Sequence, residues 1–187
     1  MREQDIKNAG FINYSLCVMF VVLTVLLVLF SMTLKEISFT KTLVEDGLMA
    51  SNLASAVIDI DEYGTTNNIV ITDTIHAYTV FLNALKDNLG LDNNLKPYND
   101  RVIVEPVEVE KYIIYNVVGN DVHVTEYRYG VKQAEITHTG AAGKMYTPDS
   151  VLITDTTIYS KIKLKLNGLL DSIVNVTKEK SVDITIS

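Results

Sequence analysis

Three histidines and one cysteine are the side chains of this chain best suited to metal binding or nucleophilic catalysis. His76, His123 and His138 are scattered, and no two are four residues apart, the spacing that places two metal ligands on one helix face. His123 and His138 could meet across a hairpin, but we expect surface or packing positions. Cys17 lies in a long apolar run, where nothing would activate its thiol. These residues predict neither an enzyme nor a cofactor.

Two short segments resemble ligand sites. Asp59, Asp61 and Glu62, with Asp73 as a fourth oxygen donor, are a weak calcium candidate. Their spacing lacks the full EF-hand loop, so we interpret them as an acidic turn after a helix. Residues 140–144 (GAAGK) resemble a phosphate-binding loop, but the glycines are too close together and methionine follows the lysine. This segment is predicted to be a flexible turn.

Composition limits the partners of the chain. Its 187 residues are 48% apolar and have a formal net charge of −7. An acidic exterior repels phosphates, so we expect no nucleic-acid partner. The single cysteine excludes an intramolecular disulfide, and a folded domain must therefore be stabilised by its core.

A membrane span is predicted near the N-terminus. No charged side chain lies between Asn8 and Leu34. About 20 apolar residues at 1.5 Å each cross a hydrocarbon core of about 30 Å, whereas a cleaved secretory signal has a shorter apolar region of roughly 7–15 residues. We therefore expect a leader or cytoplasmic tail over 1–10, a transmembrane helix over 11–34 and an extracytoplasmic domain over 35–187.

The orientation of this span is not decided by flanking charge. Arg2 and Lys7 precede it, and Lys35 and Lys41 follow it. Because the domain has the Thr- and Asn-rich strands of an exported surface, we expect a single-pass protein of the cell membrane with its N-terminus in the cytoplasm.

The helical pattern continues beyond the membrane. Leu34, Ile37, Val44 and Leu48 recur at helical spacing, which predicts one helix from about Phe11 to Ile58. Its second half should be amphipathic and pack one face on a domain. The alternative is a bend near residue 35 and a separate soluble helix.

The rest of the chain predicts an α+β fold, with a second helix packed on an antiparallel sheet. Asp73 can cap this helix and Gly90 can end it. Its predicted buried face consists of Ile75, Tyr78, Leu82, Leu85 and Leu89. Strands are predicted at 102–104, 112–115, 122–124, 157–166 and 182–187, with a hairpin turn at 119–120. The alternation within 157–166 predicts one buried sheet face, covered by the helices, and a solvated face that includes three lysines.

The N-terminal segment has the features of a known leader. Lys7 precedes Gly10-Phe11, and the apolar helix begins directly after this pair. Together with the amphipathic continuation and the β-rich C-terminal region, this resembles the type IV pilin superfamily. The nearest resemblance is to the tight-adherence (Tad) pseudopilins and the pilin-like proteins of Gram-positive bacteria. It is architectural over the whole chain and sequence-like over about residues 7–58.

The resemblance implies cleavage by a prepilin peptidase between Gly10 and Phe11. The superfamily favours a glutamate five residues after the cut, where it is thought to pair with the N-terminal amine of a neighbouring subunit. This chain has Ser15 there, after Tyr14. A serine hydroxyl can form a hydrogen bond but cannot neutralise a buried ammonium group.

The resemblance further implies a non-enzymatic structural subunit of an envelope-associated pilus or secretion assembly, which can extend to an extracellular filament. Its partners would be the membrane, other pilin-like subunits or copies of itself, an assembly platform and the peptidase. Because lipid supplies little hydrophobic drive between helices, we expect polar and small residues to hold the helix bundle together. The expected contacts are Asn13, Ser15, Thr24 and Ser31.

Two other functions fit the same sequence. One is a monomeric, membrane-anchored binding module whose contact surface is the tyrosine-rich region Tyr112–Tyr146. The other is an accessory component of a conjugation apparatus.

Overall fold

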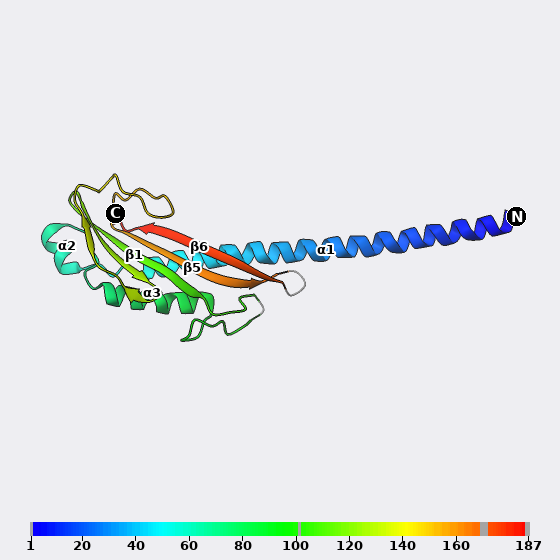
Figure 1. Cartoon of the computed structure of the whole chain (residues 1–187), viewed down its shortest axis with the longest axis horizontal. Coiled ribbons are helices and arrows are strands. Elements are labelled where there is room, and N and C mark those ends of the chain that lie inside the picture. The colour runs from blue at the N-terminus through cyan, green and yellow to red at the C-terminus, as the bar shows by residue number, and fades with distance from the viewer. Residues whose placement is uncertain (1, 101, 169–171, 186–187) are drawn as a thin grey trace.

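The computed structural model describes residues 2–100, 102–168 and 172–185, with side chains described from Tyr14 onward. Helix α1 (Arg2–Ala54) is one unbroken helix, about 80 Å long at 1.5 Å per residue. Its first half projects as a stalk, and its second half lies against the remainder of the chain (Figure 1). The prediction of a single continuous helix is confirmed, and the alternative of a separate soluble helix after residue 35 is wrong.

Helix α1 ends one turn earlier than predicted. At its end the Ser55 hydroxyl donates to the Asn52 carbonyl at 2.8 Å, and the Ala56 N–H donates to the Leu53 carbonyl, three residues back instead of four. The chain then turns, and the Asp59 N–H donates to the Val70 carbonyl. This turn is followed by the short helix α2 (Ile60–Thr66), where the sequence predicted an acidic turn.

Helix α3 (Thr74–Leu89) has both predicted ends. The Asp73 carboxylate accepts from the N–H of His76, and Gly90 has the left-handed conformation (φ 62°) that favours glycine at a helix C-terminus. The predicted buried face is shifted by about one residue. Ile75 is 66% exposed, whereas Phe81 is fully buried.

Within the described residues, six strands form one antiparallel sheet in the order β3-β2-β1-β5-β6, with β4 paired to β2. They are β1 (Glu108–Val118), β2 (Asp121–Arg128), β3 (Val131–Lys132), β4 (Ile136–His138), β5 (Thr157–Asn167) and β6 (Ile173–Asp183). The predicted hairpin joins β1 to β2 through Gly119 and Asn120. Residues 102–104 form no strand, and only Ile103 makes a bridge, to Leu166. The last strand begins nine residues earlier than expected.

The main core lies between the sheet and the two longer helices. Figure 1 shows α3 and the second half of α1 on the same side of the sheet. Val44 and Leu48 of α1, Phe81 of α3, and Ile158 and Ile162 of β5 are buried together there. The α+β class and the helices as the cover of the sheet are therefore confirmed.

The opposite face of the sheet is only partly solvated. Ile113, Tyr115 and Tyr159 form a second buried cluster on this face. Ala142 and Met145, from the segment between β4 and β5, pack against it. The prediction of a single buried face is thus wrong where this segment crosses the sheet.

Candidate helix assembly interface

The first half of α1 has an apolar surface on all sides. It is the one helix among the described residues that is long and apolar enough to cross a membrane. Every large apolar side chain from Leu16 to Phe30 is exposed in the single chain, including Phe20 at 69%. A signal sequence near the N-terminus would meet the same criteria of length and hydropathy. In either case this surface needs lipid or protein around it, because large exposed apolar areas are unfavourable in water.

Small and polar residues on this segment share one side of the helix. Cys17, Thr24, Ser31 and Ser38 follow one another at intervals of seven residues, and all four are exposed. At about 100° per residue, residues seven apart lie within about 20° of each other around the helix. Small residues let two helix backbones approach closely in a membrane. Sequence reasoning missed this row because it considered Cys17 only as a candidate nucleophile.

The predicted assembly residues do not all belong to this row. Ser15 is nine residues before Thr24, which places it about 180° away on the opposite side. The Thr24 hydroxyl donates to the Phe20 carbonyl at 2.8 Å, so toward a neighbouring helix it can only accept. Gly10, Phe11 and Asn13 lie in the helical backbone of α1, but their side chains are outside the described residues.

The second half of α1 has two faces of different character. Thr40, Val44 and Leu48 are buried against the domain. On the opposite face, Phe39 and Leu53 remain 70% and 51% exposed. This outward face also carries the exposed Lys35 and Asp46, which lie within about 20° of Leu53 around the axis. It is on the same side of the helix as the seven-residue row, because Leu53 lies about 60° or less from each member of the row. We call the row and this face together the outward side of α1.

Polar contacts fix the inward face to the domain. The buried Tyr112 hydroxyl donates to Ser55 Oγ at 2.9 Å, and burial raises the pKa of this tyrosine. The Asn52 amide donates to the Lys180 carbonyl at 2.9 Å. The Lys178 ammonium lies 2.7 Å from the Glu45 carboxylate and holds its pKa below the usual range. These contacts fix which side of α1 faces outward.

Gly47 lets α1 and α3 approach closely. A Cβ at this position would lie 2.9 Å from Leu89 Cδ2. Beside it, the Asn88 amide donates to Ser51 Oγ at 3.2 Å. The Leu89 side chain of α3 therefore packs directly on the backbone of α1 at Gly47.

The calcium candidate is used for helix capping. Asp59 accepts from the backbone N–H groups of Asp61 and Glu62 and from the Thr72 hydroxyl at 2.7 Å. The Thr72 hydrogen bond, followed by the backbone ones, lowers the pKa of Asp59. Among the described residues, no three His, Cys, Asp or Glu side chains are placed to hold a metal ion.

The histidines do not come together. His123 Nδ1 lies 2.9 Å from Thr137 Oγ1, and these two residues are directly opposite in the β2–β4 ladder. His138 is paired with Val122, one position along. Because successive residues of a strand point to opposite faces, His123 and His138 lie on opposite sides of the sheet.

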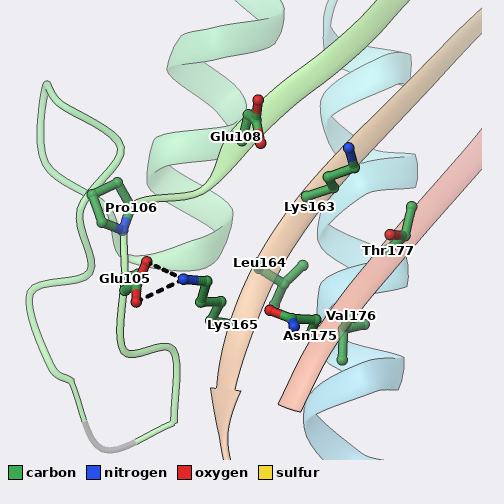
Figure 2. A pocket seen from close by; sticks show the side chains of 9 residues that line it. All are labelled: Glu105, Pro106, Glu108, Lys163, Leu164, Lys165, Asn175, Val176 and Thr177. Carbon is green, nitrogen blue, oxygen red and sulfur yellow. Dashed lines mark hydrogen bonds and ion pairs between the residues drawn. The ribbon is translucent and has the colours of Figure 1, made fainter. Parts of the chain in front are cut away.

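A polar cleft of about 370 Å³ lies between β5, β6 and the segment before β1. Figure 2 shows Glu105 and Lys165 pointing toward each other across it, and their charged atoms are 2.7 Å apart. Lys163 in the same cleft lies 3.5 Å from the Glu110 carboxylate. These two lysines of the predicted solvated face are therefore paired with glutamates.

Most tyrosines of the tyrosine-rich region are unavailable as a contact surface. Tyr112, Tyr115 and Tyr127 are buried, at 4% exposure or less. Tyr78 of α3 stacks on Tyr127 with ring centroids 4.6 Å apart. Only Tyr129 and Tyr146 of the region are exposed. Most of these rings thus serve the core.

Comparison of the chain with models of protein families, with curated proteins and with solved structures finds no significant match. The resemblance to type IV pilins therefore depends on the leader-like segment and the architecture alone.

Proposed function

We propose that this protein is a non-enzymatic structural subunit of a pilus-like or secretion assembly of the cell envelope. In this proposal it is anchored in the membrane by α1, with the N-terminus in the cytoplasm and the α+β domain outside. Copies associate side by side through the outward side of α1. The supporting observation is that α1 uses one face to hold the domain, while its other side has a row of small residues in the apolar half and, beyond it, exposed Phe39 and Leu53 together with the charged Lys35 and Asp46.

Two physical effects act along the outward side. Within the membrane, burying apolar surface against lipid or against protein differs little in free energy, so helix association depends on close packing. The small side chains of Cys17, Thr24 and Ser31 allow such packing. Beyond the membrane, Leu53 is half exposed to water. Covering it with a neighbouring copy gains about 25 cal/mol per Å² of apolar surface removed from water. One continuous helix therefore supplies both a membrane contact and an aqueous contact.

Processing of the leader is a further part of the proposal. Cleavage after Gly10 by a prepilin peptidase would leave Phe11 as the first residue of α1 and allow entry into a type IV pilin or Tad-type assembly on its platform. Ser15 lies opposite the outward side, so it would offer only an uncharged hydroxyl to any further neighbour on that side. The test is the intact mass of the protein extracted from its native membrane. Loss of Met1–Gly10 supports this route, and a full-length mass contradicts it.

A span replacement tests the helix association. Residues 14–34 are exchanged for an unrelated apolar span that lacks the small-residue row, and the copy number is measured in mild detergent. We expect the native chain to associate and the exchanged chain to be monomeric, with unchanged circular dichroism of the domain. A matched control exchanges the same span but restores Cys17, Thr24 and Ser31, and it should regain association. If the first exchange assembles like the native chain, α1 is only a tether.

That outcome would favour a membrane-anchored binding module instead. The binding-module hypothesis placed its contact surface on Tyr112–Tyr146, and three of those five tyrosines are buried. We therefore prefer the assembly subunit.

A further inference from the structure

Large apolar side chains are exposed at the end of the domain that faces the projecting half of α1. Phe39 of α1 is 70% exposed, Tyr98 in the segment after α3 is 80% exposed, and Ile173 at the start of β6 is 57% exposed. These residues come from three separate parts of the sequence. In Figure 1 the beginning of β6 and the segment after α3 both lie at this end of the domain.

An apolar groove of about 320 Å³ opens at the same end. One wall is α1 from Glu36 to Val44, and the other includes Leu89, Pro97 and Ile103. Pro97 directly precedes Tyr98, so the groove joins Tyr98 to the Phe39 side of α1.

Backbone contacts place Ile173 close to this groove. The Asn167 N–H donates to the Val102 carbonyl at 2.8 Å, and Val102 lines the groove. Asn167 is also the ladder partner of Ile173. Because Leu166 and its partner Val174 pack in the main core, Ile173, one position along, points to the other face of the sheet. Phe39 and Tyr98 therefore flank the groove, and Ile173 lies at the same end of the domain; we call these three side chains the membrane-proximal surface.

The continuity of α1 sets the height of this surface above a membrane. The uncharged run ends at Leu34, and Lys35 is the first charged residue after it. Phe39 is five residues beyond Leu34, or about 7 Å along a helix. The headgroup layer on each side of the hydrocarbon core is about 5–8 Å thick. Phe39 and the groove mouth beside Glu36 thus lie at the level of the lipid headgroups when α1 crosses the membrane upright.

We propose that the membrane-proximal surface docks on the outer leaflet of the bilayer. Phe39, Tyr98 and Ile173 enter the headgroup layer, and the groove takes a phospholipid acyl chain. Aromatic side chains favour this layer because the ring is apolar while the tyrosine hydroxyl stays hydrated. This inference depends on the membrane anchoring in the proposed function.

The charges around this surface indicate which lipids it suits. Lys35 and Lys96 are exposed beside Glu36 and Asp100, and the whole chain has a net charge of −7. These residues do not form a polybasic cluster of the kind that binds anionic lipids. Docking is therefore driven by apolar and aromatic contacts, and zwitterionic phosphatidylcholine is the appropriate probe.

The absence of tryptophan from the chain allows a direct test. Single tryptophans are introduced into the full chain as Phe39→Trp and Tyr98→Trp, and each protein is reconstituted at one copy per phosphatidylcholine nanodisc. Quenching is measured with lipids brominated near the glycerol end of the acyl chain. The matched control is Ile60→Trp, which is as exposed as Tyr98 at 80% but lies on α2, at the far end of the domain (Figure 1). Phe20→Trp in the span reports on anchoring.

We expect blue-shifted, strongly quenched emission from the tryptophans at 39 and 98 and unquenched emission from the one at 60. Replacing part of the phosphatidylcholine with anionic lipid should leave the quenching unchanged. Quenching at 20 without quenching at 98 would overturn the docking while leaving the anchor intact. Absence of quenching at 20 would overturn the anchor and the docking together. Blue-shifted but unquenched emission at 39 would mean that protein covers it, which also overturns lipid docking.

Discussion

Leu48 and Leu53 of α1 make a matched pair that separates folding from assembly. Leu48 is fully buried against the domain, whereas Leu53, five residues later, is 51% exposed on the outward side. Truncation of a fully buried leucine to alanine costs about 3 kcal/mol through lost burial and the cavity left behind. For a domain of this size, Leu48→Ala should lower Tm by about 10 °C.

Leu53→Ala should have the reverse effects. Its domain stability should change by less than about 0.5 kcal/mol, since no core contact is lost. Its half-exposed side chain would contribute about 1 kcal/mol to each copy-to-copy contact, so association should weaken about fivefold.

The assays are thermal unfolding in mild detergent, followed by sheet circular dichroism, and the dissociation constant from sedimentation equilibrium. If Leu53→Ala destabilises the domain as much as Leu48→Ala, the two-faced description of α1 is wrong. If Leu53→Ala leaves association unchanged, the outward side is not the interface.

Three further predictions concern single side chains. Pairing with Lys178 lowers the pKa of Glu45, so the ion pair stabilises the fold above pH 4.5, and this stabilisation is lost as the pH falls through the lower folded-state pKa. In urea titrations, the small difference in unfolding free energy between the native chain and Glu45→Gln should therefore disappear at acid pH. Tyr112→Phe should cost about 1 kcal/mol in urea unfolding through loss of the hydrogen bond to Ser55, and an unchanged midpoint would show that this contact does not hold α1. Calcium should leave Tm unchanged, since Asp59 is occupied as a helix cap, while Asp59→Ala should lower Tm; a calcium-dependent rise in Tm would restore the metal site.

Much of the fold follows from local sequence signals. The charge-free run predicted the long helix, and Asp73 and Gly90 marked both ends of α3. The alternation in 157–166 placed Ile158 and Ile162 correctly in the main core, because a strand has only two faces.

The errors in the predicted fold arise where contacts between residues far apart in the sequence determine the structure. Ile75 fits the helical spacing of α3, but the face of α3 that packs on the sheet is set by Phe81, whose ring lies 4.7 Å from that of Tyr112. The cover over Tyr159 comes from an irregular segment, held by the Asp149 carboxylate accepting from the Ser181 N–H at 2.8 Å. No periodic pattern in the sequence predicts such a contact.

The candidate interface was predicted only in outline. The sequence indicated an apolar helix with a few polar residues on it. It did not indicate which side of this helix faces the domain and which side remains free. That reference comes from the domain, because burial of Val44 and Leu48 fixes the rotation of α1 about its axis. Only then can the side that carries Cys17, Thr24, Ser31 and Leu53 be identified as the side facing away from the domain.

The native Cys17 provides the most direct test of association through this side. It is the only cysteine of the chain and is exposed on the outward side of α1. Membranes that contain the full chain are oxidised with a lipid-permeable catalyst, and disulfide-linked dimers are compared with those of a Cys17→Ala, Met19→Cys variant. Residue 19 is about 160° away around the helix at nearly the same depth. We predict efficient dimers through Cys17 and few through position 19. Equal yields from the two positions, or none from Cys17, would contradict the proposed assembly.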